Sequence, residues 1–584
     1  MQLFTPPSDP VAAALRACRR HFIAVATFSA LLNLLFLVPM LYMLQVYDRV
    51  IPTRGNVTLL FLTLVLLFGL ATLALLDFVR SRLLVRASIR LDRQLAGVLL
   101  DTSLARRDRT FDAVARQSMR EFDTLRQALT GPAIIALCDA PWSPIYILVC
   151  FLIHPLIGLL VLAGAVLLAI VAFRNHGATS EPLQSASEAA ARAYASQEQV
   201  LAGAENVRAL GMRRAMVRRH LAERQSMMAL QSNASFAGGR YVTISKFLRL
   251  MLQSTALGLG AWLAIGNSIS AGAVFAASFL AGRALQPIEQ LLATWRSVAQ
   301  AKSAYQKLND LLASREVDTA VTQLPPPEGR LDVEQLAVAN AAGDGAILAN
   351  ISFSLLPGEV VAVVGPSGAG KSTLLRMLAG AGRPDRGTIR VDRANMLDWD
   401  PERLAPYIGF LPQDVSLFAG TVKENIARFE DTVGAESGDV DAKAVAAAKA
   451  CFAHELILQL PNGYDSMLGW GGRGLSAGQA QRVGLARALY GDPPIILLDE
   501  PNAHLDAAGE GQLVETLLAL KARKAAVLIV AHRMGVLAAV DKILVLRDGR
   551  IEAFGARDEI LARLSGPAKP IEGPPPPVKR SAAS

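Results

Sequence analysis

The stretch Gly365-Pro366-Ser367-Gly368-Ala369-Gly370-Lys371-Ser372-Thr373 decides the fold of the second half of the chain, because it fits the phosphate-binding pattern GxxxxGK[ST]. An apolar run at 360–364 precedes it and a helical pattern at 373–378 follows, so we predict a strand, a glycine-rich turn and a helix start. Glycines let backbone N–H groups curl around the β- and γ-phosphates of a nucleotide, and the helix N-terminus adds positive potential. The stretch therefore predicts an α/β P-loop domain that binds ATP through these residues.

Side chains suited to nucleotide hydrolysis lie in this stretch and beyond it. Lys371 would place a point charge on the β/γ oxygens, and the Ser372 hydroxyl is a natural Mg²⁺ ligand. The apolar run at 495–498 has the pattern of a buried strand and ends in two carboxylates. Asp499 suits the Mg²⁺ shell, and Glu500 suits orienting or deprotonating the attacking water. The sequence thus predicts a site for ATP and Mg²⁺ with Glu500 as a catalytic residue.

Further motifs occur in the order found in ATP-binding cassette (ABC) proteins, and on them the chain resembles that family. They are Leu475-Ser476-Ala477-Gly478-Gln479 (close to the signature LSGGQ), Gln413 (Q-loop), Asn502-Ala503-His504-Leu505-Asp506 (D-loop) and His532 (switch histidine). The resemblance implies that Ser476, Gly478, Gln479 and Asp506 contact the nucleotide. It also implies that Gln413 ligates Mg²⁺ and, like His532, takes part in catalysis.

Composition predicts that the first half of the chain crosses a membrane. Of 584 residues, 52% are hydrophobic and only 19% charged, and the mean hydropathy is +0.34, which is too apolar for an ordinary cytosolic protein. A membrane-spanning helix needs about 20 mostly apolar residues. One such segment could be a buried core helix, but six ahead of an ATPase indicate an α-helical six-helix membrane domain: residues 22–46, 57–78, 134–153, 156–173, 247–265 and 271–288.

Arginine placement predicts the orientation of these segments. The connections at 80–126 and 174–246 are rich in Arg, whereas the short connections between the other segments carry only Arg49 and Arg54. Cytoplasmic segments collect Lys and Arg, so we expect both termini and the ATPase on the cytoplasmic side. The net charge of +9 then reflects this bias and contact with anionic lipid, with no nucleic-acid partner. The long connections are helix-forming and favour continuations of the membrane helices over separate helical hairpins.

These patterns divide the chain into five parts. We expect a cytoplasmic N-terminus at 1–20, the transmembrane domain at 21–313 and a proline-containing linker at 314–330. The nucleotide-binding domain would follow at 331–565. The tail at 566–584 is rich in Pro and poor in apolar residues, so we expect it to be disordered.

Several sequence motifs of the membrane half resemble those of the ATPases of bacterial type I secretion systems, in the alkaline-protease exporter (PrtD-type) branch. They are YMLQVYDRVIP (42–52), DAPWSPIY (139–146) and GRALQPIEQ (282–290), together with EPN (500–502). The resemblance implies an ABC-exporter fold and a homodimer in the bacterial inner membrane. It also implies a periplasmic membrane-fusion adaptor, a TolC-type outer-membrane channel and an unfolded secreted protein with a C-terminal signal.

Other readings stay open on sequence alone. An exporter of lipids, peptides or drugs would carry the same ATPase motifs, and an ATP-gated channel is a third class. Only about 20 residues precede the first segment, so we expect no N-terminal peptidase-like domain. Asp139 and Arg283 are ionisable groups in or near apolar segments. Asp139 could lie at the membrane interface, and Arg283 favours a role in helix packing or in a conduit.

Three positions depart from the family pattern. Ala477 replaces the first glycine of the signature, which we expect to be tolerated. Trp470 stands where related exporters commonly carry a glutamate, so coupling through that carboxylate is in doubt. No Phe, Tyr or Trp occurs between Gln306 and Ser352, where many relatives place an aromatic that stacks on adenine.

Overall fold

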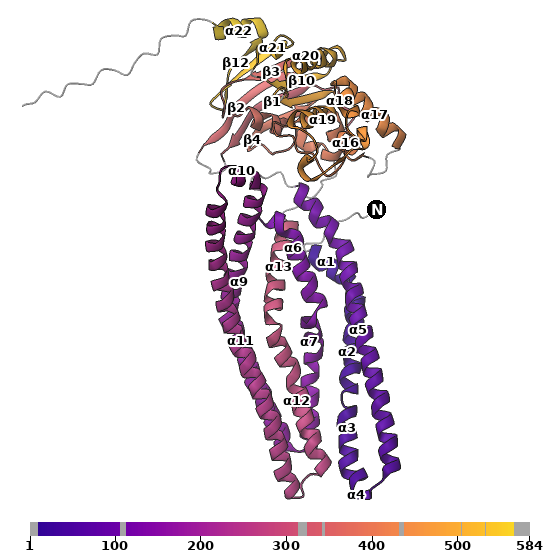
Figure 1. The fold of residues 1–584 in the computed structure, drawn as a ribbon. Coiled ribbons are helices and arrows are strands. Elements are labelled where there is room, and N and C mark those ends of the chain that lie inside the picture. Colours follow the sequence, from indigo (N-terminus) through magenta and orange to yellow (C-terminus); the bar gives the residue numbers. More distant parts are fainter. Residues whose placement is uncertain are drawn as a thin grey trace, which may run out of the picture. The chain divides into compact units, whose positions relative to one another are not determined.

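The computed structural model describes residues 10–105, 113–313, 324–340, 345–430, 437–503, 505–531 and 533–565 (Figure 1). These residues form two compact units that divide between residues 313 and 324. We call residues 10–313 the helical unit and residues 324–565 the α/β unit. His504, His532, the linker stretch 314–323 and the tail 566–584 lie outside the described residues, as does the side chain of Trp470.

The helical unit contains α-helices throughout the residues that the structure describes. Several of them are far longer than the width of a membrane requires. The helices are α1 (Pro10–Ala17), α2 (Arg19–Leu35), α3 (Val38–Gln45), α4 (Ile51–Thr53), α5 (Asn56–Ala105), α6 (Ala113–Thr130), α7 (Pro132–Asp139), α8 (Ser143–Ile153), α9 (Pro155–Ala202), α10 (Ala204–Ala209), α11 (Arg213–Ile265), α12 (Ala271–Ala293) and α13 (Trp295–Ala313). A π-helical turn, Val46–Val50, joins α3 to α4.

Five helical stretches in the described part of the chain are long and apolar enough to cross a membrane. They are Arg19–Thr53, Asn56–Ala105, Gln117–Ile153, Pro155–Ala202 and Arg213–Ile265. Each contains one of the first five predicted segments. The sixth predicted segment, 271–288, forms most of α12, which is helical but is not among these five. Its sequence includes Arg283 and Gln286, and much of the helix is buried against its neighbours. A helix that is covered by other helices needs less apolar surface than one that faces lipid.

Three apolar helices, α5, α9 and α11, continue into the polar connections without a break. Helix α9 runs for 48 residues and α11 for 53, and the two lie side by side along their length (Figure 1). The short helix α10 joins them, followed by a turn at Gly211 with φ +65°. The helix-forming composition of the long connections therefore produces the continuous helices that it predicts.

The described residues of the α/β unit form three sheets, with six, four and two strands. Its strands are β1 (Leu331–Ala339), β2 (Ala346–Leu355), β3 (Val360–Val364), β4 (Arg386–Val391), β5 (Ala394–Asn395), β6 (Ile408–Leu411), β7 (Gly420–Thr421), β8 (Met467–Leu468), β9 (Ile495–Asp499), β10 (Ala526–Val530), β11 (Lys542–Arg547) and β12 (Arg550–Ala556). Its helices are α14 (Lys371–Leu378), α15 (Pro401–Leu404), α16 (Val422–Ile426), α17 (Ser437–Ala450), α18 (His454–Leu458), α19 (Ala477–Leu489), α20 (Ala507–Ala522), α21 (Met534–Leu537) and α22 (Arg557–Ser565).

The largest sheet sets the position of the site. Its strand order is β12-β11-β3-β10-β9-β6, and all neighbours pair in parallel except β12 with β11. Strands β9 and β10 are buried at every residue, as expected for apolar strands of a parallel sheet covered on both faces. Strand β10 lies between β3 and β9. The loops that follow these three strands therefore leave the same edge of the sheet, where ligands bind in such folds.

The second half of the predicted linker packs on the α/β unit. The backbone N–H groups of Glu328 and Arg330 donate hydrogen bonds to the carboxylate of Asp392. Gly329 has φ +107°, and a Cβ there would lie 2.9 Å from the carbonyl oxygen of Pro494. These contacts anchor the chain just before β1 begins.

Candidate nucleotide-binding site

The predicted phosphate loop connects β3 to α14, and its glycines are required by its geometry. Gly368 and Gly370 have φ +81° and +98°, values that disfavour any residue with a side chain. A Cβ at Gly365 would lie 2.1 Å from the Leu546 carbonyl oxygen, and one at Gly370 would lie 2.8 Å from Leu348 Cδ2. Ser367 and Gly368 are exposed at the tip of the loop, and Ser372 and Thr373 lie in the first turn of α14. The strand, turn and helix predicted from the sequence are all present.

Lys371 is the first residue of α14 and is almost fully buried, with 6% of its surface exposed. Its Nζ donates hydrogen bonds of 2.9 Å to the carbonyl oxygens of Gly365 and Pro366. Burial lowers the pKa of the ammonium group, and the nearby carboxylates of Glu500 and Asp499 oppose that shift. The cation is thus held inside the loop, where a phosphate group could replace the two carbonyl oxygens as its partner.

Asp499 ends β9 and is 3% exposed. Burial raises the pKa of its carboxyl group, while a hydrogen bond with the Ser372 side chain lowers it. Its Oδ1 has no hydrogen-bond partner among the described residues. An orphaned buried carboxylate oxygen beside a hydroxyl is a donor set that fits Mg²⁺, which prefers oxygen ligands.

Glu500 follows Asp499 and has φ +50°, a left-handed conformation that is uncommon for residues other than glycine. Such backbone strain persists only where the surrounding structure fixes it, often at functional sites. Gln413 Nε2 donates to Glu500 Oε2 at 3.1 Å, and Gln481 Nε2 donates to the Glu500 carbonyl oxygen at 3.0 Å. The structure therefore brings Gln413 and Glu500 together, as the candidate site requires.

The sequence interpretation missed Gln481. This side chain is 3% exposed on α19 and holds the backbone of Glu500 from a helix that begins with the signature motif. Its place two residues after Gln479 is the only signal that the sequence offers. The sequence does not indicate a role for this glutamine, because its contact with Glu500 forms only when the fold places α19 against the end of β9.

The signature residues begin α19 and cap it. Gln479 N–H donates to Ser476 Oγ at 3.3 Å, and Ser476 N–H donates to Gln479 Oε1 at 2.9 Å, which is a capping box. Ser476 and Ala477 are exposed, so the methyl group of Ala477 meets no obstacle. Among the described residues, no hydrogen bond joins Ser476, Gly478 or Gln479 to the phosphate loop.

Asp506 likewise has a local partner. It precedes α20, and its Oδ1 accepts a hydrogen bond of 2.8 Å from the Gly509 N–H. This cap fixes the start of α20. A nucleotide contact by Asp506 remains a prediction, as does the role of His532, which lies outside the described residues.

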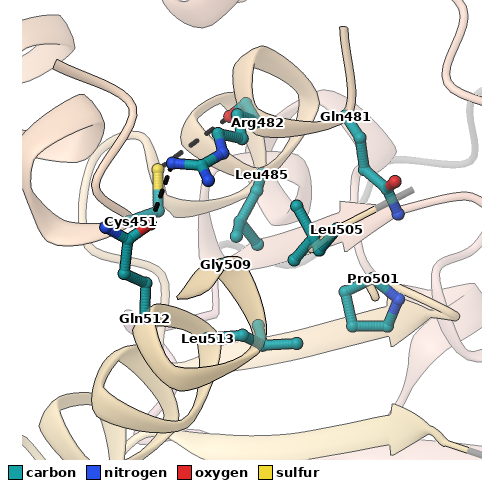
Figure 2. A pocket seen from close by; sticks show the side chains of 9 residues that line it. All are labelled: Cys451, Gln481, Arg482, Leu485, Pro501, Leu505, Gly509, Gln512 and Leu513. Carbon is teal, nitrogen blue, oxygen red and sulfur yellow. Dashed lines mark hydrogen bonds between the residues drawn. The ribbon is translucent and has the colours of Figure 1, made fainter. Parts of the chain in front are cut away.

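Helix α19 also packs against the segment that follows Glu500. Figure 2 shows Leu485 of α19 beside Leu505, while Arg482 of the same helix extends toward Cys451 and Gln512. Arg482 donates to Gln512 Oε1 at 2.9 Å, and burial raises the pKa of the Cys451 thiol to about 12. The space between these residues is about 10 Å³, room for one water molecule at most. It is a packing contact between α19 and α20 and too small for a ligand.

The phosphate loop, the acidic pair after β9 and the capped signature helix define a P-loop ATPase unit, and the first half of the chain is a bundle of long apolar helices. A family model described as ABC transporter matches residues 348–503, and one described as ABC transporter transmembrane region matches residues 21–286. The chain is therefore a multi-pass membrane protein with a nucleotide-binding ABC domain.

Similar proteins indicate which group of ABC transporters the chain belongs to. The type I secretion system ATP-binding protein PrsD of Rhizobium meliloti is 40% identical over 566 residues, which cover 96% of this chain and 95% of the relative. The cyclolysin secretion/processing ATP-binding protein CyaB of Bordetella pertussis is 31% identical over 93% of this chain and 76% of the relative. The structure of a bacterial Atm1-family ABC exporter with ATP bound has a TM-score of 0.78 at 23% identity, covering 94% and 98% of the two chains, and shows the shared fold. The chain belongs to the ABC transporters of type I secretion systems, as its motifs predict, and couples ATP hydrolysis to transport.

Proposed function

We propose that this chain is the ABC component of a type I secretion system and that it moves unfolded polypeptides across the bacterial inner membrane. The observation that carries the proposal is the end-to-end similarity to PrsD, together with an ATP site whose acidic pair is intact. The Arg-rich connections support an orientation with both termini in the cytoplasm.

The loop residues Gly365, Ser367, Gly368, Gly370 and Thr373 would bind the phosphates together with Lys371. Ser372, Asp499 and Gln413 would hold Mg²⁺, which supplies positive charge at the phosphate oxygens when it is bound. Glu500 accepts the proton of the attacking water, and Gln413 orients the Glu500 carboxylate through the bond described above. His532 would contact the γ-phosphate.

A second copy of the chain would complete the site. The signature residues make only local contacts within one chain, whereas the N-terminus of α19 presents N–H groups of the kind that bind anions. In a head-to-tail homodimer, Ser476, Gly478 and Gln479 of one copy would close over the ATP on Lys371 of the other, with Asp506 at the same junction. ATP would then favour the closed dimer because it binds that state more tightly.

The remaining partners follow from the family. A periplasmic membrane-fusion adaptor and a TolC-type outer-membrane channel would continue the path, and the cargo would carry a C-terminal signal. Secretion would then be a single step without a periplasmic intermediate.

The test is export by cells that produce this chain with an adaptor, an outer channel and a candidate cargo. We expect full-length cargo in the medium, no export after deletion of the C-terminal segment of the cargo, and no export by the Glu500→Gln chain. Mature cargo that accumulates in the periplasm when the outer channel is absent would contradict the proposal. ATPase stimulation by small amphiphiles without polypeptide export would instead indicate an exporter of lipids or drugs.

A further inference from the structure

One face of helix α19 touches the candidate catalytic groups of its own chain. Gln481, Gly484 and Arg487 are spaced three residues apart, so they lie along the same side of the helix. Gln481 donates to the backbone just after β9, as described above. The other two contact the loop of residues 412–419 between β6 and β7. We call it the Gln413 loop, after the candidate catalytic residue that it carries.

The loop approaches α19 most closely at Gly484. This glycine is buried, and a Cβ there would lie 2.7 Å from Val415 Cγ1 and 3.1 Å from Leu411 Cδ1. These distances are shorter than an ordinary van der Waals contact, so a side chain at this position would push the loop away from the helix. The packing therefore ties the first half of the Gln413 loop to α19.

Arg487 binds the second half of the loop. Its Nη1 donates to the Ser416 carbonyl oxygen at 2.9 Å, three residues after Gln413. Burial lowers the pKa of its guanidinium group. No carboxylate in the described part of the chain forms a salt bridge with it. Its neighbour is another cation, Arg428, whose Nε donates to the Arg487 carbonyl oxygen at 3.2 Å.

The bond to Ser416 explains a charged side chain in this position. Taking a guanidinium group out of water costs free energy unless hydrogen bonds offset it, and an apolar side chain of the same length would fill the space without that cost. Arg482 of the same helix shows the contrast, because it donates to the Phe452 carbonyl oxygen and to Gln512 Oε1. It thus joins α19 to segments other than the Gln413 loop.

We infer that Arg487 is a positioning residue for Gln413. The inference rests on the proposed function, in which Gln413 orients the Glu500 carboxylate. By holding the Ser416 carbonyl oxygen, Arg487 keeps the loop where Gln413 Nε2 reaches Glu500 Oε2 at 3.1 Å. Because Gln481 holds the backbone of Glu500 from the same face, one helix sets both ends of that contact, and catalysis depends on such alignment.

A double-mutant cycle on the full-length protein in nanodiscs tests the inference. Arg487→Met keeps the length of the side chain but removes its N–H donors. We expect kcat for ATP hydrolysis to fall about tenfold, since a hydrogen bond from a charged group is lost. KM for ATP should stay unchanged, because the phosphate loop is untouched. In the Gln413→Ala background, Arg487→Met should lower kcat by less than about twofold, because the residue that it positions is absent.

Arg482→Met is the matched control. It makes the same change on the same helix, but at contacts away from the Gln413 loop. Its effect on kcat should be the same factor with and without Gln413→Ala, as expected for independent sites. The affinity for a labelled ATP analogue and the midpoint of thermal unfolding verify that each variant is folded.

A second substitution covers the case in which Arg487→Met does not fold. Gly484→Ala places a methyl group against Val415 and should displace the Gln413 loop at its other contact with α19. We expect kcat to fall again, and only when Gln413 is present. Gly511→Ala is the control, because it lies within α20 and a Cβ there meets no atom within 4 Å.

The cycle can refute the inference in several ways. Arg487→Met would leave kcat unchanged, or would lower it by the same factor with and without Gln413. Equal masking of Arg482→Met by Gln413→Ala would show that any disturbance of α19 has this effect. An unchanged kcat in Gln413→Ala alone would refute the proposed role of Gln413 and the inference with it. Export is measured separately, so absence of polypeptide export with the expected coupling would refute the cargo and leave the inference standing.

Discussion

The phosphate loop and the signature segment both belong to the candidate ATP site, but they differ in their contacts within one chain. Other candidate site residues surround the loop, whereas the polar groups of the signature segment bond to one another. Lys371 of the loop is buried, and Ser372 forms a side-chain hydrogen bond with Asp499. The adjacent Glu500 accepts hydrogen bonds from Gln413 and Gln481. The signature segment is exposed, and its polar groups satisfy one another in a capping box. The difference agrees with the proposal that the catalytic groups are preorganised within one chain, whereas the signature residues would contact the nucleotide only in a homodimer.

The largest effect is expected from replacing Glu500, the candidate general base. In Glu500→Gln the amide cannot accept the proton of water, so turnover should fall by about 100- to 10,000-fold, the usual contribution of a general base. ATP binding should remain near the wild-type level because the phosphate loop is unchanged. The measurement is phosphate release alongside nucleotide affinity, with the exposed Glu515→Gln on α20 as the matched control. Near-normal hydrolysis in Glu500→Gln would refute the assigned role.

The next effect concerns binding itself. Lys371→Ala removes the buried cation from the loop and should weaken ATP affinity by about 10- to 100-fold, since hydrogen bonds to charged groups contribute about 1.5–3 kcal/mol. Equilibrium binding of a labelled ATP analogue measures it. Lys449→Ala, an exposed lysine on α17, is the control and should bind normally. Unchanged affinity in Lys371→Ala would place the nucleotide elsewhere.

Gln481 tests whether α19 positions the catalytic residue. Gln481→Ala removes the bond to the Glu500 carbonyl oxygen, a bond of the kind that contributes about 1 kcal/mol, so kcat should fall several-fold with little change in KM for ATP. A merely structural side chain would alter both constants or neither. Gln459→Ala, which is exposed, should leave both unchanged.

A variant of Ser476 tests whether the capping box stabilises the first turn of α19. Ser476→Ala removes the cap of α19 and should destabilise the first turn by about 1 kcal/mol. Hydrogen exchange of the amides at the start of α19 should therefore be several-fold faster in the protein without nucleotide, while Ser476→Thr should retain most of the protection. If exchange does not change, the capping box does not hold this turn.

The smallest expected effect concerns the base. Phosphate and Mg²⁺ contacts are common to all nucleoside triphosphates, and aromatic stacking on the base is worth about 1 kcal/mol. Because 306–352 has no aromatic residue, ATP and GTP should be hydrolysed at rates within several-fold of each other at subsaturating concentration. A preference for ATP beyond about a hundredfold, nearly 3 kcal/mol, would reveal a base-recognition group that this prediction lacks.

The sequence by itself determined the features that depend on neighbouring residues. The phosphate loop and the first five apolar spans follow from patterns of a few to about 20 residues, since turn geometry and hydrophobic length are local properties. The family follows as well, because several such patterns occur in a fixed order.

Only the tertiary structure decided which distant side chains meet. The bonds of Glu500 to Gln413 and Gln481 join three separate elements, and the ion pair between Arg80 of α5 and Asp139 of α7 joins two more. A side chain's electrostatic partner depends on the packing of helices and strands that are far apart in the chain, and packing has no short-range signature in the sequence. The composition of 271–288 predicts a membrane span, but only the fold shows that much of this helix, α12, is buried against its neighbours.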